Sequence, residues 1–159
     1  MTPPSITEIP ECKLIGMHTD LSLIDNKTQS LWQQFMPRRQ EVHQRVGQSF
    51  YSMQVYAPGF SMQNFTPHTV FTKWAAVEVS SFENVPKGMH AFTLPSGKYA
   101  VFIHKGPASA FKPTFDYIFG EWLPKSAYTL DQRPHFELLP EGYVPTDPNA
   151  EEEVWIPIT

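Results

Sequence analysis

Two glutamates stand in the middle of segments that have the composition of β-strands. Glu78 lies within 70–79 and Glu137 within 133–139, and both have aromatic or aliphatic neighbours. Strand alternation places Glu78 on the same face as Trp74. Burying a carboxylate without a partner is costly, so carboxylates in such surroundings favour binding of a cation. The alternative is that both glutamates point to solvent from a sheet with one exposed face.

Aromatic residues strengthen the case for a cation. They make up 14% of the 159 residues, and a cation above an aromatic face gains about 0.5–2 kcal/mol. In the segment 50–56, alternation brings Ser52, Gln54 and Tyr56 onto one face. The glutamates and aromatic side chains together predict a surface for an amphipathic or cationic small molecule.

Other kinds of site lack their motifs. The six histidines are scattered without metal-ligand spacing, and Cys12 is the single cysteine. The sequence contains neither a Gly-x-Ser-x-Gly nucleophile motif nor a glycine-rich phosphate loop. We therefore expect no bound metal and no cofactor.

The charge balance and the N-terminus limit the class of protein further. A net charge of −4 argues against a protein that gains its affinity from the phosphates of nucleic acid. The first residues lack the basic and apolar regions of a signal peptide. The apolar runs are too short to cross a bilayer. We expect a cytoplasmic protein with no membrane contact.

The elements that must position these residues occur in the same order twice. Helical spacing connects Leu31 to Met36 and Phe111 to Trp122, and Pro37 and Pro124 are expected to end these helices. Strand patterns occupy 12–18, 50–56, 70–79, 89–94, 98–104, 133–139 and 153–158.

Each half therefore reads as a strand, a helix and two strands. We expect an α+β fold with antiparallel sheets, in a single domain over 1–159. Its repeats would cover about 6–84 and 89–159, with a cleft where they meet.

Several segments together resemble one known family. The most specific are Pro-Ser-Gly-Lys-Tyr-Ala at 95–100, Trp-Leu-Pro at 122–124 and Arg-Pro-His-Phe-Glu at 133–137. Leu-Trp-Gln-Gln-Phe at 31–35 and Trp-Ala-Ala-Val-Glu-Val at 74–79 precede them. In this order and spacing, the chain resembles the GyrI-like, or AraC-type, effector-binding domains over nearly its whole length.

The resemblance implies two pseudo-symmetric repeats around a central groove that binds lipophilic or cationic compounds. In multidrug-sensing regulators of this family a groove glutamate pairs with the cation, and the matching residue here is Glu137. Trp74, Tyr99 and Trp122 lie in or beside the family's motifs, with core packing as the alternative for each. The full set of candidate ligand-binding residues is Glu137, Trp74, Tyr99, Tyr56, Trp122 and Glu78.

The family's regulators carry a DNA-binding domain ahead of the ligand domain, whereas here the ligand domain starts by about Ile6. The resemblance therefore implies the stand-alone form, without direct DNA contact. Such a protein would sense or sequester a ligand, in transcription regulation or in protection against toxins.

Two alternative functions stay open. Some stand-alone members resemble hydrolases that open cyclopropane-type genotoxins, in which case Glu137 would act as general base with help from Tyr99 or Tyr128. Others inhibit DNA gyrase, and the acidic run 151–153 would then contact gyrase or another protein partner. Such a run is more often a solvated strand edge.

Overall fold

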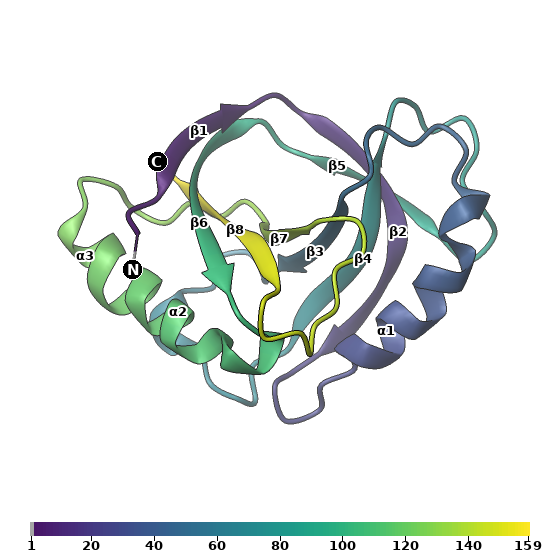
Figure 1. The fold of residues 1–159 in the computed structure, drawn as a ribbon. Helices are drawn as coiled ribbons and strands as arrows, with labels where there is room; N and C mark the ends of the chain where they lie inside the picture. The colour runs from purple at the N-terminus through teal and green to yellow at the C-terminus, as the bar shows by residue number, and fades with distance from the viewer. Residues whose placement is uncertain (1) are drawn as a thin grey trace.

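The computed structural model describes residues 2–159 and is built on one curved antiparallel sheet of eight strands (Figure 1). The spatial order of the strands is β1-β6-β8-β7-β3-β4-β2-β5. Their bounds are β1 Ser5–Ile9, β2 Cys12–Leu21, β3 Phe50–Val55, β4 Phe71–Val79, β5 His90–Leu94, β6 Gly97–Lys105, β7 His135–Leu139 and β8 Glu151–Ile158.

The strand order has an internal symmetry. β3 and β7 are neighbours in the middle, followed outward by β4 and β8, then β2 and β6, then β5 and β1. The α+β class and the repeated order of strand, helix and two strands are confirmed. A single sheet replaces the separate sheets that we expected, because β3 and β7 pair directly across the boundary between the halves. The sequence patterns did not predict β1.

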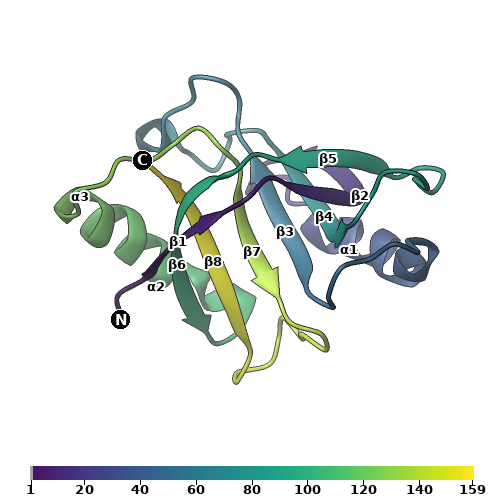
Figure 2. The same cartoon turned by 90° about the horizontal axis from the view of Figure 1, so that it is seen from above.

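Two helical segments lie on the same face of the sheet, one beside each half (Figures 1 and 2). The first is α1 (Thr28–Phe35), which continues as the 3₁₀ turn η1 (Met36–Glu41). The second is α2 (Phe111–Tyr117), followed by the π-helical turn η4 (Ile118–Trp122) and by α3 (Leu123–Lys125). Two further 3₁₀ turns are η2 (Met62–Asn64) and η3 (Ala108–Ala110).

The two prolines expected to end the helices each stand at the start of a helical turn. Pro37 lies in the first turn of η1 and Pro124 in the first turn of α3. The second helical segment ends at Lys125, one residue beyond Pro124, close to the end that the sequence predicts. No helix in the described part of the chain combines the length and the apolar character that a membrane span requires.

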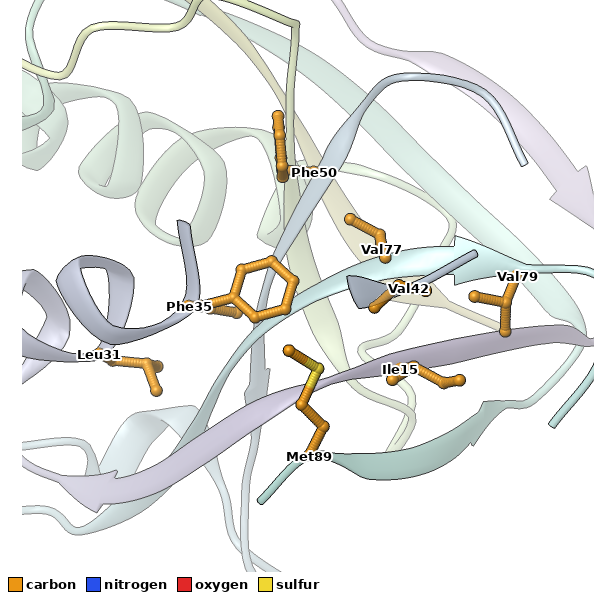
Figure 3. Packing of buried hydrophobic residues seen from close by; sticks show 9 residues of the cluster. Ile15, Leu31, Phe35, Val42, Phe50, Val77, Val79 and Met89 are labelled. Carbon is orange, nitrogen blue, oxygen red and sulfur yellow. The ribbon is translucent and has the colours of Figure 1, made fainter. Parts of the chain in front are cut away.

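Apolar side chains cover both faces of the central strands. Between α1 and the sheet they form a cluster that includes Phe35, Phe50, Val77 and Val79 (Figure 3). A second cluster, with Phe102, Ile118 and Ile156, lies under α2. A third occupies the opposite face and includes Leu14, Trp74, Tyr99 and Phe136. Alternation along β4 is as the sequence predicts, with Trp74 and Ala76 facing away from α1.

At Gly16 the backbone of β2 approaches that of β4 closely. A Cβ atom at Gly16 would clash with the carbonyl oxygen of Ala75 and would lie 2.6 Å from Cα of Ala76. Backbone atoms of β4 occupy the place that a side chain at this position would take, so glycine is required here.

We predict that Gly16→Ala lowers the free energy of unfolding by about 2–3 kcal/mol, because backbone atoms of β4 would have to move. Urea denaturation followed by circular dichroism measures the change. Gly120→Ala is the matched control, since a Cβ atom there meets nothing within 4 Å. Equal stability of Gly16→Ala and the wild type would contradict the assigned close approach.

Candidate functional site

A row of polar side chains crosses the four central strands on the face that carries the helices. It consists of Lys73 on β4, Gln54 on β3, Glu137 on β7 and Glu152 on β8. All four residues are buried or nearly so. We call these four residues the polar row.

Strand alternation puts the row on this face. Phe136 and Leu138 pack in the cluster on the opposite face, so Glu137 between them points toward the helices. Lys73 is placed in the same way by its neighbour Trp74. Val154 packs under α2, which assigns Glu152, two residues earlier, to the helix-bearing face.

Glu137 is the centre of the row. Its Oε1 atom lies 3.5 Å from Nζ of Lys73 and accepts a 2.9 Å hydrogen bond from Nε2 of Gln54. The exposed fraction of the side chain is 16% for Glu137 and 8% for Lys73. The carboxylate therefore forms an ion pair inside the protein instead of pointing to open solvent.

Glu152 adds a second carboxylate. Its burial raises its pKa, and the negative charge of Glu137 raises it further; the Tyr143 hydroxyl, His104 and Lys73 oppose this shift. Tyr143 belongs to the loop between β7 and β8, which passes between the two helical segments (Figure 1). With both carboxylates ionised, the row has two negative charges and one positive charge.

Six aromatic rings form a closed circuit next to the polar row. Successive ring centroids are 4.7–6.3 Å apart, within the range for favourable aromatic pairs. The order around the circuit is Tyr56, Phe71, Phe65, Phe115, Phe119 and His135, and a seventh ring, Phe60, stacks on Tyr56 at 5.5 Å. These seven residues are the aromatic cluster.

The two groups meet at Tyr56 and His135. Burial raises the pKa of Tyr56, and the charge of Glu137 raises it further. The Tyr56 ring centroid lies 5.0 Å from that of His135. His135 is two residues before Glu137 on the same strand face. The middle of the helix-bearing face thus combines buried carboxylates with aromatic rings from both halves of the chain.

The Glu137 carboxylate is in contact with the side chains of Lys73 and Gln54. Two shallow hollows of about 350 Å³ and 210 Å³ lie elsewhere. The larger is beside Glu41 and Pro86, and the smaller lies along the end of the second helical segment. Neither includes a residue of the polar row. A cation that pairs with Glu137 would compete with Lys73 for the carboxylate.

The structure brings together two of the six candidate ligand residues, Glu137 and Tyr56. Three others lie on the opposite face of the sheet. Tyr99 is fully buried there and donates a 2.9 Å hydrogen bond to the carbonyl of Pro134, which fits core packing. Trp74 is also in this core.

Glu78 and Trp122 lie away from the polar row as well. The Glu78 carboxylate accepts a 3.3 Å hydrogen bond from the hydroxyl of Tyr51 on the opposite face. Trp122 packs beside Phe102 and Tyr128 under the second helical segment and lines the smaller hollow.

Lys73, Glu152 and most of the aromatic cluster belong to no motif. One feature of the sequence could have identified Lys73. It is a charged residue on the same strand face as Ala75 and Val77, in an otherwise apolar segment. Phe115 and Phe119 are four residues apart on a helix, which places them on one side. Within residues 2–159, no group of three histidine, cysteine, aspartate or glutamate side chains could hold a metal ion.

Comparison with known proteins identifies the family. A model of the GyrI-like small molecule binding domain matches residues 2–159. The chain belongs to this family. The GyrI-like chain is 30% identical over 154 residues to the transcriptional regulator BrlR of Pseudomonas aeruginosa, covering 96% of this chain and 54% of the regulator. It thus spans about half the length of BrlR.

Solved structures share the GyrI-like fold. SAV2435, in a structure bound to tetraphenylphosphonium, superposes with a TM-score of 0.75 at 17% identity, covering 99% of this chain and 94% of that one. EcmrR, in a complex with DNA, gives a TM-score of 0.70 at 17% identity, with 97% and 56% of the two chains covered. At such identities these similarities establish the fold alone.

Burial of His135 makes stability depend on pH. Burial lowers the pKa of His135 from 6.5 to about 3, so below pH 6.5 the unfolded chain binds a proton that the folded protein does not. The free energy of unfolding falls as the pH decreases. We predict that the wild type loses about 2 kcal/mol more than His135→Phe between pH 7.5 and pH 5.

Urea denaturation at the two pH values measures this difference. Phenylalanine keeps an aromatic ring between Tyr56 and Phe119. Substitution of the exposed His43 by glutamine should leave the wild-type pH dependence intact. The same pH dependence in the wild type and His135→Phe would refute a neutral, buried His135.

Proposed function

We propose that this protein binds a lipophilic organic cation at the junction of the polar row and the aromatic cluster. The single observation that carries the proposal is the buried carboxylate of Glu137 beside rings from both halves. A buried carboxylate needs a positive partner, and aromatic faces attract delocalised cations. In this structure Lys73 provides that partner, with Nζ 3.5 Å from the carboxylate.

The comparisons support this class of ligand. SAV2435 has been solved with tetraphenylphosphonium, a cation whose charge is shielded by four phenyl groups. BrlR is a transcriptional regulator. We propose that ligand binding serves to sense or sequester the cation, in regulation or in protection against toxic compounds.

The alternative functions find less support in the geometry. A hydrolase that uses Glu137 and Tyr99 requires both side chains at one site, yet they lie on opposite faces of the sheet. The acidic run 151–153 does not form one surface for a partner such as gyrase. Glu152 is buried, while Glu151 lies 3.6 Å from Lys105 and Glu153 accepts a hydrogen bond from Trp155.

Substitution of the two mid-strand glutamates tests the site. We predict that Glu137→Gln weakens tetraphenylphosphonium binding about tenfold or more, because the neutral amide no longer attracts the cation by its charge. Glu78→Gln, on the opposite face, should bind like the wild type. Isothermal titration calorimetry measures both affinities.

Triphenylphosphine oxide, which is neutral and aromatic, controls for hydrophobic binding. Its affinity should be the same in the wild type and in both variants. If Glu137→Gln and Glu78→Gln bound tetraphenylphosphonium equally well, Glu137 would not be the cation's partner. Circular dichroism establishes that each variant is folded.

A further inference from the structure

We propose that Lys73 occupies the cation position at Glu137 in the ligand-free protein and transfers to Glu152 when a cationic ligand binds. This inference rests on the function proposed above and adds how the site is regulated. It also restricts the ligand to compounds with one positive charge.

Lys73 reaches its partner from a distant strand. It stands on β4, whereas Glu137 is on β7, with β3 between them. Neighbouring strands are about 4.8 Å apart, so the side chain must lie along the sheet to bring Nζ within 3.5 Å of the carboxylate. In this extended conformation the Lys73 ammonium group neutralises the Glu137 carboxylate in place of water.

A ligand cation and Lys73 compete for the same group. Oε1 of Glu137 already interacts with both Lys73 and Gln54. Placing a second positive charge beside Lys73 in a buried site would leave one cation without a partner, which is strongly unfavourable. Lys73 must therefore move before a cation can pair with Glu137.

Glu152 offers Lys73 a second partner. It lies on β8, two residues from Val154, which is paired with Glu137, so the two glutamates are diagonal neighbours on the helix-bearing face. The Nζ atom of Lys73 is 3.5 Å from the Glu137 carboxylate. Among residues 2–159, no ion pair is formed by Glu152 within 4.0 Å. If Lys73 pairs with Glu152 and the ligand with Glu137, every buried charge has an opposite charge beside it.

The number of charges defines the class of ligand. Two carboxylates and one ammonium leave room for one additional positive charge. A neutral compound would gain nothing from displacing Lys73, and an anion would add to the excess negative charge. A single delocalised charge within an aromatic framework fits both the polar row and the aromatic cluster.

The proposal predicts opposite effects for two substitutions. Lys73→Met removes the competitor and should tighten tetraphenylphosphonium binding about tenfold or more. Glu152→Gln removes the alternative partner of Lys73 and should weaken binding about tenfold. In the double variant the second substitution should no longer weaken binding, because no lysine needs a new partner.

Isothermal titration calorimetry of the four proteins measures this coupling, with triphenylphosphine oxide as the neutral probe. Lys13→Met removes an exposed lysine from another strand and should bind like the wild type. Lys73→Gln, which keeps a polar side chain, replaces Lys73→Met if the latter does not fold. The transfer is supported if removal of the Lys73 charge, by Lys73→Met or Lys73→Gln, tightens tetraphenylphosphonium binding and Glu152→Gln no longer weakens binding in that background.

Two outcomes would overturn the proposal in different ways. If wild-type binding depends on Glu137 but removal of the Lys73 charge does not tighten it, the transfer is wrong while the cation site stands. The same holds if Glu152→Gln weakens binding equally with and without Lys73. If no variant prefers tetraphenylphosphonium over triphenylphosphine oxide, the proposed cation site fails and the transfer fails with it.

Discussion

The pairing of β3 with β7 is the constraint on which the rest of the structure depends. Five residue pairs join these strands, with Ser52 opposite Glu137 and Gln54 opposite His135. A shift of one residue would turn Glu137 to the opposite face, toward Trp155 and Tyr99, and would separate it from Lys73. One register therefore joins the two halves into a single sheet and assembles the polar row across their boundary.

The ion pair in this row is not explained by stability. Removing two charges from water costs several kcal/mol per ion, and the attraction between them often only offsets that cost. Apolar side chains of similar size would serve a sheet centre at least as well, as they do on the opposite face, where Met53 and Phe136 pack together. Charges at the centre of the helix-bearing face fit a role in binding a ligand at that face.

Local sequence patterns predicted every strand except β1, and they predicted which side chains share a face. Alternation within β4 and β7 depends on the backbone alone, so the orientations of Trp74 and Glu78 relative to Val77 follow from residue spacing. The role of Lys73 does not, because it depends on β3 lying between β4 and β7. The aromatic cluster likewise needs the loop residue Phe65 to contact Phe115 on a helix from the other half, and long-range contacts of this kind leave no local pattern. For Tyr99 the family motif predicted a ligand-binding residue, whereas the side chain packs in the core on the opposite face.

The outermost strands restrict how the molecule can respond to a ligand. β1 is followed after two residues by β2 but pairs with β6 of the second half, and β5 is followed after two residues by β6 but pairs with β2 of the first. The edge strand beside each half therefore belongs to the other half of the chain. A hinge motion that separated the halves would have to break both edge ladders as well as the central one. A ligand would therefore reach the buried carboxylates through movement of the loops and helices on the helix-bearing face, while the sheet keeps its conformation.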